Sequence, residues 1–201
     1  MNSPLAGPLA LVLAYLIGSV DFAVVVARMH GVNIHEVGSG NPGASNVMRA
    51  LGKGPAVMVF VGDALKGVIA AAIGTLLTGA SSPISPWVFA AGLAAVFGHC
   101  YPIYHRFRGG KGVATGGGVV FFTMPLAGVI LTVVWITVAR LTRVASIASL
   151  TVLVTTLPLA LWQGVRGMAL VLLGAMLSLV VYRHRGNISR ILRRSEQTVD
   201  S

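Results

Sequence analysis

The hydrophobic residues of the chain gather in long runs, without the alternation of half-buried strands or the single apolar stripe of surface helices. Most runs approach the length of about 20 residues that a helix needs to cross a bilayer. The runs are Pro4–Ala27, Pro55–Thr78, Ile84–Phe97, Val113–Ala139, Val144–Trp162 and Met168–Tyr182. Short polar segments separate them. The pattern predicts an all-α fold, a polytopic membrane helical bundle.

The fourth run contains two kinds of helix-breaking residue. The glycine triplet Gly116–Gly118 lies near its start and Pro125 near its middle, and proline ends or kinks a helix. We therefore predict two short helices within residues 113–139 that turn near Met124 and Pro125, giving about seven transmembrane helices in all. A re-entrant pair buried in the bundle is the alternative.

The positive charges support two passes through the fourth run, because its basic flanks then lie on one side of the membrane. Cytoplasmic loops carry an excess of Lys and Arg, which predicts an outside amino terminus and a cytoplasmic carboxyl terminus. Thirteen of the fifteen basic residues then share the cytoplasmic side: Arg28, Arg49, Lys53, Arg106, Arg108, Lys111, Arg140, Arg143, Arg183, Arg185, Arg190, Arg193 and Arg194. Lys66 lies inside the second span and Arg166 on the opposite side.

Composition agrees with this topology. The 201 residues are 55% hydrophobic and 10% charged, and the mean hydropathy is +0.84. We expect a single transmembrane domain over residues 1–201 with a basic cytoplasmic tail at 183–201. The single Cys100 excludes an intrachain disulfide. No metal-ligand cluster appears in the sequence, and we expect no cofactor, nucleic acid or obligate protein partner.

Candidate chemistry lies in three polar segments, which we call the islands. Island 1 spans residues 38–49 and matches G-x-G-x-x-G at Gly38, Gly40 and Gly43. The match does not indicate a dinucleotide site, because a transmembrane helix replaces the βαβ unit that such a site needs. The segment is better suited to binding a phosphate, because it offers hydrogen-bond donors from glycine amides, hydroxyls, side-chain amides and an arginine. The alternative is a flexible turn.

Island 2 spans residues 99–112 and contains Gly109-Gly110-Lys111-Gly112. It fails as a P-loop, because no Gly lies five residues before Gly110 and Lys111 is not followed by Ser or Thr. Flanking glycines still allow the Lys111 ammonium to approach a phosphate. For Arg106 and Arg108 a purely topological role is the simpler interpretation. A packed, hydrogen-bonded role is the simpler one for His99, as is structural support for Asp63 and Lys66.

Island 3 spans residues 183–190 and places His184 and Asn187 on one helical face. A histidine beside a phosphate suits acyl or phosphoryl transfer at neutral pH. Ser146 adds a hydroxyl one turn into the membrane from the same side. A serine there more often bonds to its own helix.

Together, these motifs resemble the bacterial acyl-phosphate:glycerol-3-phosphate acyltransferases of phospholipid synthesis. The resemblance rests on Gly38-Ser39-Gly40-Asn41, Gly43-Ala44-Ser45-Asn46 with Arg49, Gly98-His99, Gly109-Gly110-Lys111-Gly112, Arg183-His184 and Asn187-Ile188. It covers almost the whole chain. Asp21, where the family commonly has proline, Pro42 and Ser45 depart from the usual pattern.

The resemblance implies a bacterial inner-membrane enzyme with its site facing the cytoplasm. It would transfer a fatty acyl group from acyl phosphate to the 1-hydroxyl of sn-glycerol 3-phosphate, giving lysophosphatidate and phosphate. The implied catalytic residues are Ser39, Lys111, Ser146, His184 and Asn187. The implied substrate- and phosphate-binding residues are Arg49, Gly38, Gly40, Asn41, Gly43, Asn46, Gly109, Gly110 and Gly112.

Other functions fit the sequence less well. A transporter of an organic phosphate would carry polar groups near the bilayer midplane and often a repeated half, whereas these groups gather at one face without a repeat. A lipid-binding scaffold leaves Ser39, Asn41 and Lys111 unexplained. None of the five histidines begins the His-x4-Asp pair of acyltransferases that use thioester donors.

Overall fold

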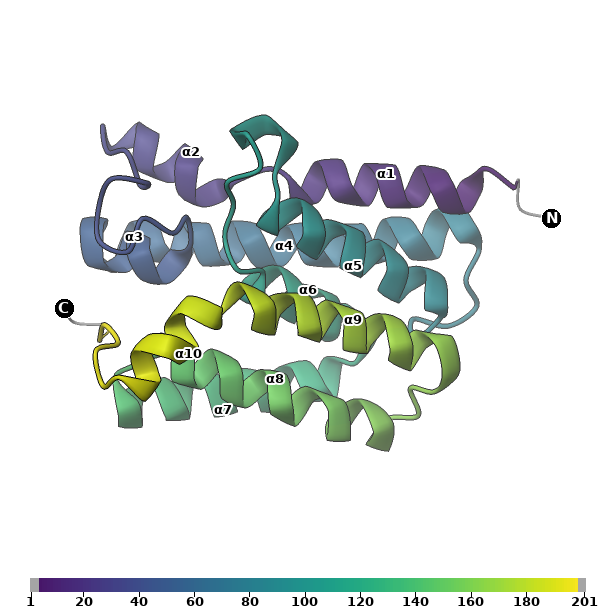
Figure 1. Ribbon diagram of the computed structural model, residues 1–201. Helices are drawn as coiled ribbons and strands as arrows, with labels where there is room; N and C mark the ends of the chain where they lie inside the picture. The colour runs from purple at the N-terminus through teal and green to yellow at the C-terminus, as the bar shows by residue number, and fades with distance from the viewer. Residues whose placement is uncertain (1–3, 199–201) are drawn as a thin grey trace.

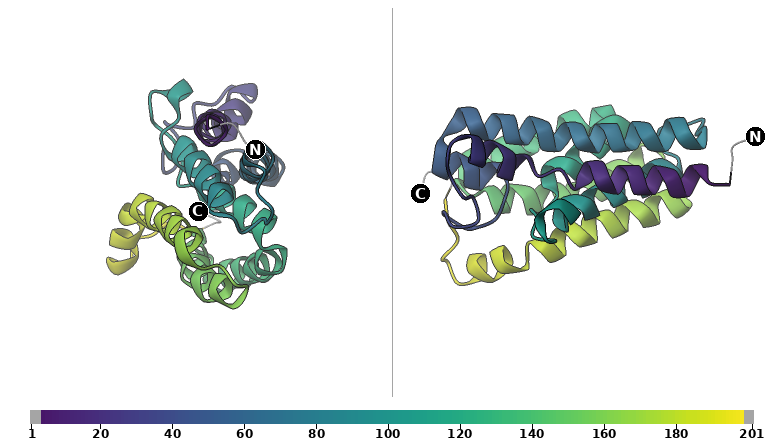
Figure 2. Two further views of the ribbon diagram at one scale, coloured as in Figure 1. Left: turned by 90° about the vertical axis from the view of Figure 1, so that its right-hand side faces the viewer. Right: turned by 90° about the horizontal axis from the view of Figure 1, so that it is seen from above.

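The computed structural model describes residues 4–198, and within this range it contains helices and no strand. The elements are α1 (Ala6–Gly18), α2 (Phe22–Met29), α3 (Ala44–Leu51), α4 (Lys53–Thr78), α5 (Pro86–Cys100), η1 (Ile103–His105), α6 (Val113–Thr123), α7 (Pro125–Thr142), α8 (Ala145–Trp162), α9 (Gly167–Arg183) and α10 (Arg185–Leu192). The long helices run roughly alongside one another in one elongated bundle (Figures 1 and 2). The predicted all-α bundle is confirmed.

Five stretches within residues 4–198 are long and apolar enough to cross a membrane. They are Ala6–Met29, Lys53–Thr78, Pro86–His105, Pro125–Thr142 and Ala145–Trp162. The helices α9 and α10 form a sixth candidate together, although the chain bends by 54° between them. The 11-residue α6 is a seventh apolar helix, but at 1.5 Å per residue it is too short to cross alone.

The fourth apolar run breaks where its sequence indicates. Helix α6 ends at Thr123, Met124 leaves the helical conformation, and Pro125 begins α7. Proline suits this first helical position, where its missing N–H has no partner to lose. The two helices form a hairpin in which Phe121 packs over Gly128, so α7 runs back past the start of α6 toward the end of the bundle that carries α3 and α10 (Figure 1).

Close packing of small residues brings the helices together. A Cβ atom built on Gly67 of α4 would lie 2.0 Å from the Thr115 carbonyl oxygen of α6, and one on Gly118 would lie 2.0 Å from the Ala64 oxygen of α4. The same relation joins α1 and α5, where Gly18 meets the backbone of Ala95. Such approaches need residues without side chains, as is usual where membrane helices cross.

Asp21 caps the first broken span. The chain leaves α1 at Gly18, and the Asp21 carboxylate accepts a hydrogen bond of 3.1 Å from the Val24 N–H at the start of α2. An aspartate is well suited to this N-cap position. Asp21 therefore has a local role in the fold.

Candidate active site

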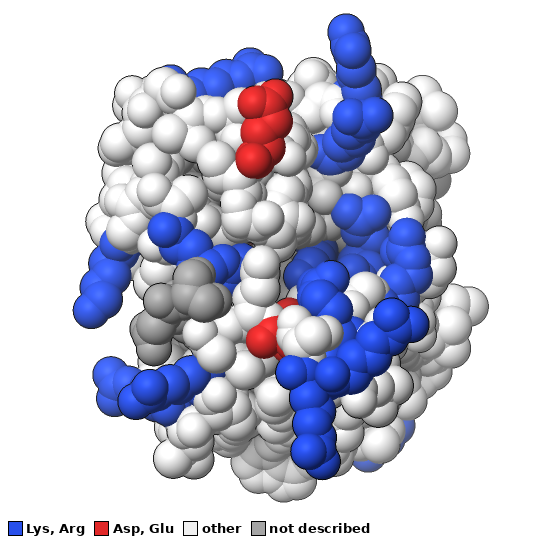
Figure 3. All heavy atoms as spheres, turned by 60° about the vertical axis from the view of Figure 1, so that its left-hand side comes forward, with Lys and Arg blue, Asp and Glu red and all other residues white. Residues whose placement is uncertain are grey.

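Islands 1 and 3 lie at the end of the bundle opposite to the end where α1 begins, and the island 2 loop lies beside them, nearer the middle of the bundle (Figure 1). Lys and Arg side chains ring this end of the molecule (Figure 3). An open pocket of about 450 Å³ is lined by residues from every island and by His35. The island residues are Ser39, Gly40, Asn41, Pro42, Phe107, Arg108, Gly109 and Arg183. Segments that are far apart in the sequence thus form one polar cavity.

Island 1 forms a loop that ends in α3, and Asn46 organises it. This buried side chain accepts a hydrogen bond of 2.9 Å from the Ser39 N–H and donates to the carbonyls of Val37 (3.0 Å) and Ile34 (3.3 Å). Gly38 turns through the left-handed conformation beside it, at a φ of 54°. The side-chain oxygen and nitrogen of Asn46 thus form hydrogen bonds within the loop itself.

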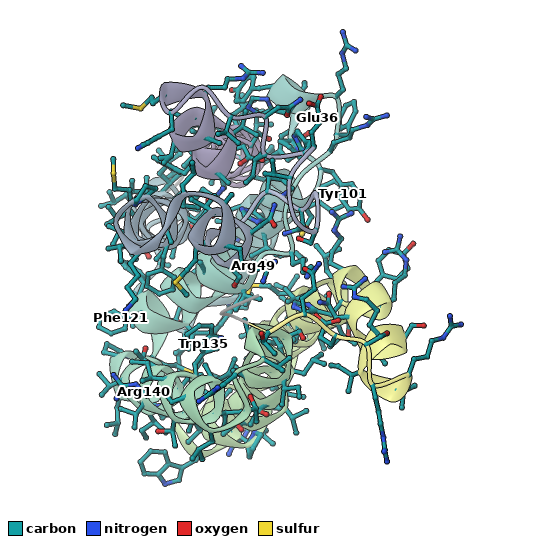
Figure 4. The ribbon with its side chains drawn as sticks, turned by 90° about the vertical axis from the view of Figure 1, so that its left-hand side faces the viewer. Glu36, Arg49, Tyr101, Phe121, Trp135 and Arg140 are labelled. Atoms are coloured by element: carbon teal, nitrogen blue, oxygen red, sulfur yellow. The ribbon has the colours of Figure 1, made fainter. Side chains whose placement is uncertain are left out.

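Arg49 leaves α3 toward the middle of this end of the bundle (Figure 4). Its guanidinium is 3.5 Å from the Ser39 hydroxyl and 3.4 Å from the Asn46 side-chain oxygen. It also donates to the Thr198 carbonyl oxygen, at 3.5 Å. These contacts bring Arg49 next to Ser39, whose side chain lines the cavity.

Island 2 is held from both sides. Arg183 donates to the carbonyl oxygens of Gly110 (3.0 Å) and Gly109 (2.7 Å), and its guanidinium lies over the Tyr101 ring at 5.1 Å. The Gly112 φ of 88° then turns the chain into α6. Glycine is needed here, because other residues are strained in this conformation. Lys111 is held between these two fixed points.

Lys111 is half-buried among other charges. Burial of the ammonium is the main cause that lowers the pKa of Lys111 to about 8. The Glu196 carboxylate opposes this shift, and the positive charges of Arg190, Arg49 and Arg183 add to it. A positive centre surrounded by other cations attracts a phosphate strongly.

Island 3 lies where α9 turns into α10. His184 is buried, and its ring Nδ1 is 2.8 Å from the Val180 carbonyl oxygen. Since a carbonyl only accepts hydrogen bonds, Nδ1 carries the proton, and Nε2 of the neutral ring is an acceptor. Asn187, one turn further, is also buried.

Glu196 joins Ser146 to island 3. Its Oε1 accepts hydrogen bonds from the Ser146 hydroxyl at 3.0 Å and from the Asn187 amide, and its Oε2 forms an ion pair with Arg190 at 2.8 Å. Neither Glu196 nor Arg183 stands among the site residues predicted from the sequence. The available signal for Glu196 was its charge, since only five acidic residues occur in the whole chain.

The structure therefore gathers the sequence-predicted residues toward one end, in two groups. In one group, Ser39, Gly40 and Asn41 line the pocket and Arg49 contacts Ser39. In the other, Ser146 and Asn187 bind Glu196, and His184 lies one turn before Asn187. Within residues 4–198, no three His, Cys, Asp or Glu side chains are grouped so as to hold a metal ion.

Comparison with known proteins decides the family. A model of the family described as "Glycerol-3-phosphate acyltransferase" matches residues 8–194. The chain belongs to the glycerol-3-phosphate acyltransferase family. A member from Rubrobacter xylanophilus is 42% identical over 200 residues, covering 94% of this chain and 93% of its own length. One from Aquifex aeolicus is 42% identical over 182 residues, covering 90% and 93%.

Two solved structures extend the family likeness to the fold. Both are crystal structures of PlsY, an integral membrane glycerol 3-phosphate acyltransferase. The glycerol 3-phosphate form has a TM-score of 0.89 at 40% identity, and the lysophosphatidic acid form 0.87 at 39%. Each comparison covers 96% of this chain and 94% of the solved one. The resemblance predicted from the three islands is confirmed, and the protein is an integral membrane acyltransferase.

Proposed function

We propose that the protein transfers a fatty acyl group from an acyl phosphate to the 1-hydroxyl of sn-glycerol 3-phosphate. The products are 1-acylglycerol 3-phosphate, or lysophosphatidate, and inorganic phosphate. The observation that carries this proposal is the likeness to PlsY, whose solved forms are named for glycerol 3-phosphate and lysophosphatidic acid. The cationic end of the bundle, with Ser39, Arg49 and Lys111, offers the groups that phosphorylated substrates need.

The reaction requires no covalent enzyme intermediate. The acceptor oxygen forms an ester bond with the acyl carbon, and the bond between that carbon and the phosphate oxygen breaks. The hydroxyl proton goes to His184 Nε2 or to the departing phosphate. Because an acyl phosphate is already activated, positioning and charge stabilisation supply the catalysis.

Each predicted residue has a role in this proposal. Arg49 and Lys111 hold phosphate oxygens and offset the repulsion between two anionic substrates. Ser39, Ser146, His184 and Asn187 orient the acceptor and the reacting phosphate. The backbones of Gly38, Gly40, Gly43, Gly109, Gly110 and Gly112, with Asn41 and Asn46, shape the cavity.

An acyl phosphate is the proposed donor, in preference to an acyl thioester. The chain contains no His-x4-Asp pair, which is the general-base arrangement of the thioester-dependent glycerolipid acyltransferases. The surplus of Arg and Lys around the cavity suits a second phosphate in the donor. The family assignment also favours this enzyme over a transporter of organic phosphates.

The membrane orientation completes the proposal. We infer a single transmembrane domain over residues 1–201 in a bacterial inner membrane, with the site and the basic tail at 183–201 on the cytoplasmic side. The support is the thirteen basic residues assigned to one side. A cytoplasmic site would receive soluble glycerol 3-phosphate and anionic donor there.

The test uses purified protein in detergent with sn-glycerol 3-phosphate and one donor at a time. The donors are palmitoyl phosphate, palmitoyl-CoA and palmitoyl-carrier protein. We expect lysophosphatidate and inorganic phosphate, in equal amounts, only with palmitoyl phosphate. Product from a thioester at a comparable rate would contradict the donor, and a folded sample inactive with all three would contradict the enzyme assignment.

A further inference from the structure

A cluster of ionisable side chains lies inside the bundle, behind the cavity. Asp63 and Lys66 of α4 and His99 of α5 are 3%, 2% and 6% exposed. None of them belongs to the residues proposed to contact substrate. Charged groups within membrane helices are costly and are kept where they serve function.

The cluster is internally paired. Lys66 Nζ is 2.8 Å from Asp63 Oδ1 and donates a second hydrogen bond of 2.8 Å to the Val20 carbonyl oxygen. His99 Nδ1 is 3.5 Å from the same Asp63 oxygen. Lys66 therefore neutralises the carboxylate, which in turn faces one edge of the His99 ring.

The other edge of the His99 ring touches the loop that carries Lys111. A Cβ atom built on Gly110 would lie 2.2 Å from His99 Nε2, so no side chain fits between them. The backbone of His99 supports the same loop, because its carbonyl oxygen accepts a hydrogen bond of 3.1 Å from the Gly110 N–H. His99 thus supports the residue next to Lys111 through both its ring and its backbone.

Two further groups hold Gly110 against His99. The Arg183 guanidinium binds the Gly110 carbonyl oxygen at 3.0 Å. The Pro42 carbonyl oxygen of island 1 would be 2.5 Å from the same hypothetical Cβ atom. Gly110 is therefore enclosed by His99, by Pro42 of island 1 and by Arg183 of island 3. A shift of the His99 ring would move Gly110 and disturb its contacts with both islands.

We propose that the Asp63–His99 pair positions the glycine loop, residues 109–112, and through it the phosphate-binding ammonium of Lys111. Both are positioning residues, since neither is placed to touch substrate, and the kinetic part of this inference rests on the proposed function. A carboxylate that fixes the orientation of an imidazole acts in the same way behind metal-bound histidines. Here the oriented ring supports a backbone loop instead of a metal.

The test compares Asp63→Asn, His99→Gln and His99→Ala with the wild-type protein. We expect kcat/KM with palmitoyl phosphate to fall by about 10–100-fold, as outer groups typically cost. Melting temperatures should stay close to wild type for the His99 variants and fall for Asp63→Asn, which leaves the buried Lys66 without its carboxylate. His99→Gln should retain more activity than His99→Ala, because its amide still fills the space beside Gly110. Asp63→Asn keeps the shape of the side chain, so it can replace His99→Ala in the comparison if that variant does not fold.

Hydrogen–deuterium exchange gives a measurement that does not depend on activity. In Asp63→Asn and His99→Ala, amides in peptides covering residues 106–116 should exchange faster while those of α4 and α5 stay protected. Faster exchange throughout α4 and α5 would show that the cluster only holds helices together and would overturn the proposal. Wild-type kinetics together with unchanged amide exchange in residues 106–116 would also overturn the proposal.

Asp21→Asn is the matched control. Asp21 is a buried carboxylate whose charge also acts on His99, but the carboxylate that pairs with the His99 ring is that of Asp63. Asparagine preserves the N-cap of α2. We expect near-wild-type kinetics and loop exchange. An equal loss in this variant would assign the effect to buried charge in general and overturn the role of the Asp63–His99 contact. If neither the wild type nor any variant transfers acyl groups, the proposed function fails. Hydrogen–deuterium exchange of the loop still tests whether Asp63 and His99 position it.

Discussion

At the scale of single residues, the site depends on side chains whose surroundings alter their chemistry. Lys111 is an ammonium whose pKa is lowered by burial and by neighbouring arginines. Glu196 is a carboxylate enclosed by donors from Ser146, Asn187 and Arg190. Each residue is the basis of a separate prediction.

Removal of the Lys111 side chain should impair catalysis more than folding. We expect Lys111→Ala to lower kcat/KM about a hundredfold or more, comparable to the loss of one oxyanion donor. Arg106→Ala, an exposed cation of the same loop, is the control and should be close to wild type. Steady-state kinetics with both variants decides this, and near-wild-type activity of Lys111→Ala would remove Lys111 from the site.

The pKa of Lys111 predicts a pH dependence. The ammonium is charged below its pKa of about 8 and neutral above it, so phosphate binding weakens as the pH rises through that value. Because kcat/KM reports groups of the free enzyme, it should fall on the alkaline side with a midpoint near pH 8. Lys111→Arg should move the fall to higher pH, since arginine stays charged. An identical midpoint in this variant would assign the titration to another group.

Glu196 should matter for stability as well as activity. Glu196→Ala leaves the buried Ser146 and Asn187 groups without their acceptor, and buried unsatisfied groups cost about 1–3 kcal/mol. We expect a clearly lower melting temperature and lower activity. The exposed Glu36, at the same end of the bundle, offers Glu36→Ala as the control. Equal melting temperatures for both variants would show that Glu196 is dispensable.

At the scale of elements, the crossing of α4 and α6 sets the position of the glycine loop along the bundle axis. The helices approach through Gly67 and Gly118, each in contact with the backbone of the other helix. Helix α6 begins directly after Lys111 and Gly112, so this crossing also fixes where island 2 enters the cavity.

Two neighbouring glycines of α6 should therefore respond differently to substitution. Gly118→Ala places a methyl group against the Ala64 carbonyl oxygen and should cost about 1–3 kcal/mol, as overpacking typically does. Gly117 has open space where a methyl group would be added, with no atom within 4 Å, so Gly117→Ala should leave the melting temperature unchanged or raise it. Thermal unfolding in detergent distinguishes them, and an equal response would contradict the close helix crossing.

At the scale of the whole molecule, the bundle separates an apolar body from one cationic end. Islands 1 and 3 lie at that end, and the island 2 loop lies beside them (Figures 1 and 3). The hairpin of α6 and α7 makes this possible, because α7 runs back past the start of α6 toward that end.

The proposed orientation can be tested on the 201-residue chain. A fluorescent protein fused after residue 201 should fluoresce, and alkaline phosphatase fused there should be inactive, because the carboxyl terminus is expected in the cytoplasm. Fusions before residue 1 should give the reverse. The positive-inside rule supplies the reason. Active phosphatase at the carboxyl terminus would invert the topology.

The sequence by itself determined the helical bundle and most of the candidate site. The apolar runs predicted where the long helices lie, because any segment inside a bilayer must satisfy its own backbone hydrogen bonds. Pro125 predicted the break at Met124, since proline fixes its own conformation and lacks an N–H. The ordered motifs with Ser39, Lys111 and His184 indicated the family.

Only the tertiary structure decided how these residues act on one another. That Asn46 is used to build its own loop, that Arg183 holds the glycine carbonyls, and that Glu196 joins Ser146 to Asn187 depend on contacts across 9 to 74 positions of the chain. So does the support of Gly110 by His99 and Asp63. Local sequence patterns report conformational preference and burial, whereas side-chain partners depend on which helices pack together.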